Sequence, residues 1–134
     1  MQIEEKPAFA TPFEWIGGED RVKALVERFY DLMDLEPGYA ALRTTHGSDL
    51  ANARQRLFWF LCGWLGGPQH YTERFGHPML RARHMPFPIA IKERDHWLAC
   101  MDQAMQETGV PADLRTRLKA SFFQTADWMR NSHG

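Results

Sequence analysis

The 134-residue sequence has no strong excess of charge of either sign and no long apolar run. Its 16 Lys and Arg residues face 17 Asp and Glu residues, so no basic surplus is present to neutralise phosphates, and we expect no nucleic-acid partner. The densest apolar run, Leu57 to Leu65, is far shorter than the ~20 residues of a membrane span. The first six residues lack the apolar core of a signal peptide. We therefore expect a cytoplasmic protein that does not enter membranes.

Cysteine is also scarce. Cys62 and Cys100 are the two in the chain, and they do not form a CxxC pair. Each lies within a helical pattern of apolar residues, which is typical of a buried, reduced thiol in a cytosolic protein. We expect neither a disulfide framework nor a cysteine-based metal site.

Bulky apolar side chains, in contrast, are abundant. Nine Phe, five Trp and seven Met contribute to a hydrophobic fraction of 44%. This length suits one domain, which we place at residues 13–131, with tails at 1–12 and 132–134. A core rich in Met and Phe can pack around a flat organic ligand, although a plain helical core uses the same residues.

The spacing of the apolar residues predicts an all-α fold, and no stretch alternates as a strand would. A first amphipathic helix begins at Glu19 and ends before Pro37-Gly38. Its inner face consists of Val22, Leu25, Val26, Phe29, Tyr30 and Met33.

The segments after this helix follow the same logic. A short helix is expected near residues 39–43, and Ser48 or Asp49 is expected to cap a helix that ends at Gly66-Gly67-Pro68. Only short helical pieces fit between residues 69 and 88. A long helix is then expected over about 91–108, followed by a last helix with Pro111 as its first residue.

The segment from Gly76 to Ile89 combines one histidine, His84, with arginines, prolines and bulky apolar residues. An axial nitrogen, apolar walls and positive charge for the propionates are what a haem requires. A lone histidine is more often a surface residue than a ligand. However, a haem needs a single protein nitrogen, whereas a zinc helix would need a second histidine three or four residues away.

Four segments together resemble the group II truncated haemoglobins of bacteria. They are Gly66-Gly67-Pro68, Tyr71-Thr72-Glu73, the run from Gly76 to His84, and Arg94-Asp95-His96-Trp97-Leu98. The resemblance extends from about Trp15 to Asn131. It implies a two-over-two helical sandwich that encloses haem b, with His84 as the proximal iron ligand and its other ring nitrogen donating to a carbonyl or a water.

The resemblance also places the distal side of the pocket. The oxygen-contacting position falls on Tyr30, the tryptophan of the group falls on Trp97, and the loop position beside the haem falls on His46. Dioxygen on ferrous haem carries partial negative charge, so each hydrogen-bond donor would stabilise it by roughly 1.5–3 kcal/mol. His46 could instead bind the iron or face solvent.

Further residues are candidates for contact with the cofactor. Arg56, Arg81, Arg83 and Tyr71 are candidates for the haem propionates, and for each arginine an exposed surface charge is an equal alternative. The candidate walls, several of which could instead be general core, are Leu57, Phe60, Leu61, Met79, Leu80, Phe87, Ile89 and Met101.

Several functions fit these residues. The first is reversible binding of O₂, CO or NO, with slow release that suits O₂, NO or peroxide redox chemistry better than bulk transport. NO dioxygenase or peroxidase-like turnover would need an external reductase, and His46 would be the acid/base for peroxide. The alternatives are a haem-based gas or redox sensor that acts through a partner protein and a haem-free helical interaction module. Both a monomer and a homodimer remain open.

Overall fold

The computed structural model describes residues 9–46, 50–79 and 90–130, and within these ranges it contains helices and no strand. The all-α prediction is therefore confirmed for the described part of the chain. The elements are α1 (Pro12–Ile16), α2 (Glu19–Leu35), the 3₁₀ turn η1 (Pro37–Tyr39), α3 (Ala40–Thr44), α4 (Ala51–Trp64), α5 (His70–Phe75), α7 (Ile91–Glu107) and α8 (Ala112–Trp128).

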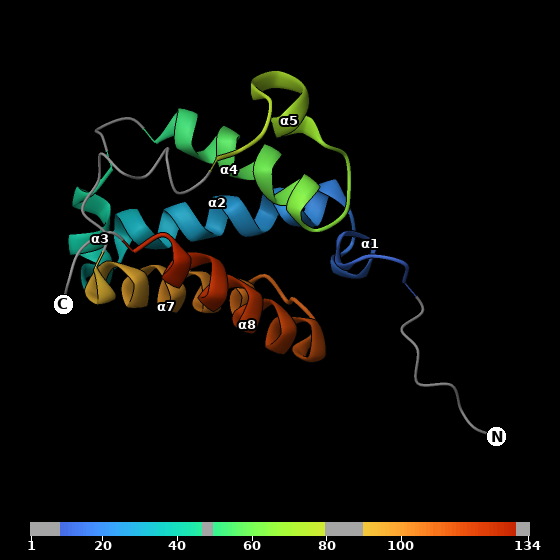
Figure 1. Ribbon diagram of the computed structural model, residues 1–134. Helices are drawn as coiled ribbons and strands as arrows, with labels where there is room; N and C mark the ends of the chain where they lie inside the picture. Colours follow the sequence, from blue (N-terminus) through green and yellow to red (C-terminus); the bar gives the residue numbers. More distant parts are fainter. Residues whose placement is uncertain (1–8, 47–49, 80–89, 131–134) are drawn as a thin grey trace.

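The four long helices form two layers. Helix α2 packs against α4 on one side and against α7 on the other, and α7 packs along α8. Figure 1 shows α2 and α4 above α7 and α8, with α5 on the outer side of α4. This is the expected two-over-two arrangement.

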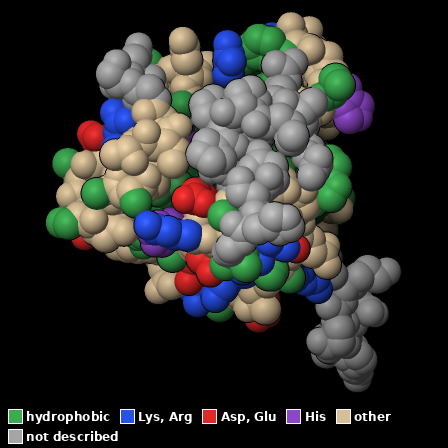
Figure 2. Space-filling model, turned by 60° about the vertical axis from the view of Figure 1, so that its left-hand side comes forward, with side chains coloured by type: hydrophobic (Ala, Val, Ile, Leu, Met, Phe, Trp, Pro, Cys, Tyr) green, Lys and Arg blue, Asp and Glu red, His purple; other side chains and the backbone are tan. Residues whose placement is uncertain are grey.

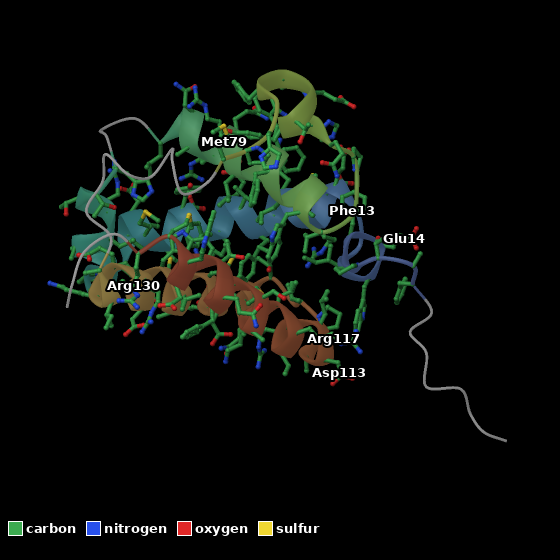
Figure 3. The ribbon with its side chains drawn as sticks, viewed as in Figure 1. Phe13, Glu14, Met79, Asp113, Arg117 and Arg130 are labelled. Carbon is green, nitrogen blue, oxygen red and sulfur yellow. The ribbon has the colours of Figure 1, made fainter. Side chains whose placement is uncertain are left out.

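The core lies between these layers. Figure 3 shows side chains of α2 and α4 pointing toward those of α7 and α8. The apolar face predicted for the first helix is buried throughout. The same core cluster includes Met101 and Met105 of α7 and Leu114 and Leu118 of α8. The period of 3.6 residues thus places one continuous apolar face of each helix in the core.

Two predicted helix starts need correction. Helix α4 begins at Ala51 with Leu50 at its N-cap position, so neither Ser48 nor Asp49 is the cap residue, and both lie outside the described residues. Helix α8 begins at Ala112, and Pro111 is its N-cap residue rather than its first helical residue. Proline serves well there because its extended backbone (φ −54°, ψ 141°) turns the chain into the helix.

Helix α1 has no counterpart in the sequence prediction, which assigned Thr11 and Pro12 to the N-terminal tail. The Thr11 hydroxyl accepts a hydrogen bond from the backbone N–H of Glu14 at 3.1 Å, and Pro12 is in the first turn. The sequence Thr-Pro-Phe-Glu carries this signal, because a threonine cap followed by proline is a favourable helix start.

The glycine pair after α4 allows α1 to approach closely. Gly66 has a φ of +98°, a conformation that side chains with a Cβ rarely adopt. A Cβ on Gly67 would lie 2.5 Å from the ring of Phe13, whose backbone N–H donates to the Leu65 carbonyl at 2.9 Å. Larger residues at either position would therefore push α1 away from the end of α4.

Two smaller expectations concern thiols and membranes. Cys62 and Cys100 are both buried free thiols, as predicted. Among the described helices, none combines the length and the apolar character that crossing a bilayer requires.

Replacing Leu25 by alanine tests the core of α2. Leu25 is 0% exposed, so Leu25→Ala leaves a cavity and should lower the free energy of unfolding by about 2–5 kcal/mol. Leu35 ends the same helix and is 70% exposed, so Leu35→Ala should change it by less than about 0.5 kcal/mol. Urea unfolding followed by circular dichroism measures both. Equal losses in the two variants would contradict this description of the core.

Candidate functional site

The three predicted distal donors come from three separate elements and gather around Phe29. The Tyr30 ring meets the Phe29 ring edge-on at 5.0 Å between centroids, and the Trp97 ring of α7 lies 5.2 Å from the Phe29 ring. His46, which follows α3, lies 5.9 Å from the Tyr30 ring. The structure therefore brings Tyr30, Trp97 and His46 into one cluster.

Two of these side chains keep an unused donor. Tyr30 is only 5% exposed, and neither its hydroxyl nor the indole N–H of Trp97 makes a hydrogen bond to any residue that the structure describes. Both donors therefore suit an acceptor that arrives as a ligand.

Burial also controls the protonation of Tyr30. Loss of solvation raises the pKa of its phenol well above the usual value near 10, and the nearby Arg54 guanidinium opposes this with a smaller effect. The hydroxyl therefore keeps its proton, and remains a donor, at every pH at which a cell works.

The hydrogen bonds of His46 define its neutral tautomer. Its Nδ1 lies 3.2 Å from the Leu42 carbonyl oxygen and 3.2 Å from the Thr45 hydroxyl, and that hydroxyl donates to the same carbonyl at 2.7 Å. A carbonyl can only accept, so Nδ1 carries the proton. In the neutral ring Nε2 is then an acceptor, and it becomes a donor only when His46 is protonated.

Helix α4 covers the cluster with aromatic and aliphatic side chains. Leu57 and Phe60 are half-buried, and Phe60 meets the Tyr71 ring edge-on at 6.2 Å. Trp64 stacks on Phe122 of α8 at 4.7 Å between centroids. These contacts tie α4 to α5 on its outer side and to α8 on its inner side.

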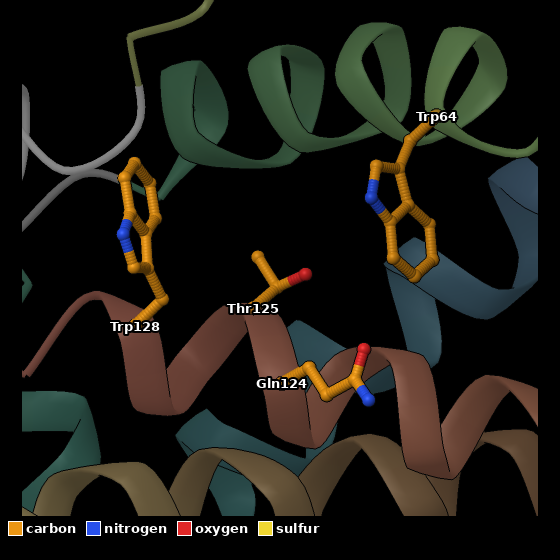
Figure 4. Close-up of a pocket in the computed structure, with 4 residues that line it drawn as sticks. All are labelled: Trp64, Gln124, Thr125 and Trp128. Atoms are coloured by element: carbon orange, nitrogen blue, oxygen red, sulfur yellow. The ribbon is translucent and has the colours of Figure 1, made fainter.

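A hollow of about 340 Å³ opens between α4 and α8. Its walls are Trp64, Gln124, Thr125 and Trp128, with the two tryptophans at opposite ends (Figure 4). Trp128 is 59% exposed, so a large part of this apolar side chain remains accessible at the rim of the hollow. A wide, shallow, mainly apolar space of this kind fits a flat organic group.

Of the other residues predicted to contact the cofactor, some are buried in the core and others are exposed. Leu61 and Met101 are fully buried in the core, and Met101 also lines a smaller hollow of about 220 Å³ beside α8. Arg56 is exposed, with its guanidinium 5.3 Å from the Phe75 ring centroid, and Met79 is 58% exposed. Met79 lies on the α5 side of the molecule (Figure 3).

Six predicted residues lie outside the described part of the chain. They belong to the segment between Met79 and Ala90, which is the N-cap residue of α7. The residues concerned are Leu80, Arg81, Arg83, His84, Phe87 and Ile89.

The sequence prediction did not include Trp64, Gln124 or Trp128 among the site residues. Trp128 lies three positions after Thr125, on the same side of α8. This spacing was the available signal. Because Trp128 comes at the end of α8, its exposure could not be read from the pattern.

Comparison with known proteins shows the family to which the chain belongs. The family model of the bacterial-like globins matches residues 11–131. The chain belongs to this family. A curated relative, the group 2 truncated haemoglobin YjbI of Bacillus subtilis, is 41% identical over 124 residues, which are 92% of this chain and 91% of the relative.

Solved structures agree with this placement. The cold-adapted truncated haemoglobin of the Antarctic bacterium Pseudoalteromonas haloplanktis TAC125 is 44% identical with a TM-score of 0.88, covering 92% of this chain and 99% of the other. The group II 2-on-2 haemoglobin of Agrobacterium tumefaciens is 43% identical with a TM-score of 0.89, covering 96% and 99%. The chain is thus a group II truncated haemoglobin, and such a globin binds diatomic gases through haem.

The residues of this truncated haemoglobin fit a haem. The hollow between α4 and α8 suits a flat apolar group, and the Tyr30 and Trp97 donors, which are not among the residues that line it, suit a polar diatomic ligand. Figure 2 shows the side of the molecule to the left in Figure 1, where Lys and Arg side chains lie among Asp and Glu side chains.

The protonation of Tyr30 can be tested directly. We expect Tyr30→Phe to leave the absorbance change near ~295 nm between about pH 9 and 11 unaltered, because the buried phenol does not ionise in that range. A spectrophotometric titration of the folded protein measures this change. The chain has three tyrosines. If the variant loses about a third of the wild-type signal in this range, Tyr30 ionises normally and its hydroxyl does not keep its proton.

Proposed function

We propose that this truncated haemoglobin holds O₂ on haem b, with His84 as the proximal iron ligand, and that Tyr30 and Trp97 retain the ligand by hydrogen bonds. The observation that carries the proposal is the pair of donors, Tyr30 and Trp97, whose rings both contact Phe29 and which make no hydrogen bond to a described residue. The haem would supply an iron atom that binds the diatomic molecule and makes its outer atom partly negative.

The protein side chains would prepare the site for that charge. Tyr30 is buried and stays protonated, so its hydroxyl can donate without first being desolvated. Trp97 supplies an indole N–H, which is a donor only and cannot compete for protons. Leu57 and Phe60, both half-buried, would keep water from the ligand.

Two converging donors favour slow release. Stabilisation of a bound state appears mainly in the dissociation rate, and CO, which carries less charge on its oxygen than O₂, would gain less from the same donors. A protein that releases O₂ slowly is poorly suited to bulk transport. It suits a reaction that consumes the bound ligand, and we propose NO dioxygenation with electrons from an external reductase in the cytoplasm.

Peroxide chemistry is the second candidate, and the hydrogen bonds of His46 favour it. Because Nδ1 donates to the Leu42 carbonyl, protonation of the ring takes place at Nε2. A histidine that gains and loses its proton at one defined atom beside Tyr30 can act as the acid/base that peroxide cleavage requires. A sensor role is the alternative, and it would require a partner whose affinity changes with the gas ligand.

Removing either donor should speed ligand release. We expect Tyr30→Phe and Trp97→Phe each to raise the O₂ dissociation rate by roughly tenfold to hundredfold, the equivalent of one hydrogen bond to a charged acceptor. Tyr39→Phe is the matched control, because the Tyr39 hydroxyl donates to Gln103 at 2.7 Å, outside the cluster. Stopped-flow mixing of the oxygenated protein measures all three rates. Wild-type rates in both cluster variants would refute the proposal.

Removing His84 should release the haem. We expect His84→Ala to lose most of its haem, judged by the Soret absorbance per protein, since no other group would replace the axial nitrogen. His70→Ala is the control, because His70, the first residue of α5, pairs at 2.8 Å with Glu19, the first residue of α2. Added imidazole should restore haem binding to His84→Gly. Full haem content in His84→Ala, or failure of imidazole to rescue a folded His84→Gly, would contradict the assignment.

A further inference from the structure

Arg54 joins α4 to α2 next to the distal cluster. Its guanidinium donates to the carboxylate and, at 3.2 Å, to the backbone carbonyl of Glu27, and to the carboxylate of Asp31 at 2.9 Å. These bonds use both terminal nitrogens and connect two helices that pack against each other. Charged hydrogen bonds with two partners hold a guanidinium in one orientation.

The same bonds place Arg54 over Tyr30. Glu27 and Asp31 are three residues before and one residue after Tyr30 on α2, so the guanidinium they hold lies beside that ring. Its central carbon is 5.8 Å from the Tyr30 ring centroid. This is within the ~6 Å at which a cation and an aromatic ring attract each other.

We propose that Arg54 is a positioning residue for the distal site: it holds the Tyr30 ring in place and strengthens its hydroxyl as a hydrogen-bond donor. This inference rests on the proposed role of Tyr30. It adds a residue from α4 that would not touch the ligand and would act on it through the phenol.

Two effects of one contact support this role. The ring of Tyr30 is confined between Phe29, His46 and Arg54, which restricts the direction of its hydroxyl. The positive charge, 5.8 Å from the ring centroid, also lowers the pKa of Tyr30 relative to burial alone, because it stabilises negative charge on the phenol oxygen. A more polarised O–H donates a stronger hydrogen bond.

Arg28 provides a matched comparison within the same helix layer. It also joins two helices through a carboxylate, since its guanidinium lies 2.6 Å from Glu107 of α7. Among the described residues, however, it lies over no aromatic ring. Arg28→Met therefore removes an interhelical ion pair without touching the distal cluster.

The test compares three variants of the haem-loaded protein. We expect Arg54→Met to raise the O₂ dissociation rate roughly threefold to tenfold, a smaller effect than that of Tyr30→Phe. It should also shift the C–O stretch of the ferrous CO complex to higher frequency, because a weaker donor leaves the ligand less polarised. Arg54→Lys, which keeps the charge but not the two-nitrogen geometry, should fall between Arg54→Met and the wild type, and Arg28→Met should match the wild type in both measurements.

A double-mutant cycle then shows whether Arg54 acts through Tyr30. In a Tyr30→Phe background, Arg54→Met should add no further change to either measurement. An equal change in both backgrounds, or an equal change in Arg28→Met, would overturn the inference and leave a general structural effect. If Tyr30→Phe has no effect, the proposed donor role of Tyr30 fails, and this inference fails with it. If only Arg54→Met has no effect, the function stands and this inference falls.

Discussion

The geometry of the distal site depends on the packing of Phe29 between α2 and α7. Phe29 is completely buried, its ring contacts those of Tyr30 and Trp97, and its carbonyl accepts a hydrogen bond from the Cys100 thiol at 3.3 Å. The ring and the backbone of one residue thus fix the distance between the two helices. Because the Tyr30 and Trp97 donors sit on either side of this contact, their separation is set by core packing, which is close to rigid, rather than by loop structure.

Local sequence patterns were sufficient for the helices but not for the contacts between them. The spacing of Val22, Leu25 and Phe29 predicts α2, and the structure confirms it, because a helix of this kind is determined by its own apolar period. The predicted cap residue of α4 was wrong. A helix can begin with or without a side-chain hydrogen bond from Ser or Asp, so its first residue cannot be read from the sequence alone. Helix α1 was missed because five residues give too short a pattern to detect by period.

Some residues of the site could likewise be predicted from the sequence, whereas others depend on how the helices pack. Tyr30, Trp97 and His46 could be named from the resemblance, and the structure brings them together, although what they do remains a proposal. Arg54 and Trp128 could not be named. Arg54 reads as an ordinary surface charge until the register of α4 against α2 places it beside Glu27 and Asp31. That register is a property of tertiary packing, and no period within α4 encodes it.

Function and stability draw on the same residues in this molecule. Tyr30 is buried and Trp97 half-buried, neither donor makes a hydrogen bond to a described residue, and Trp128 is 59% exposed beside the hollow. Binding of haem would cover the ring, and binding of a diatomic ligand would satisfy the donors. Any group that binds the folded state and not the unfolded one stabilises the fold in proportion to its affinity. The residues that would bind the haem and its ligand therefore also make the stability of the fold depend on both.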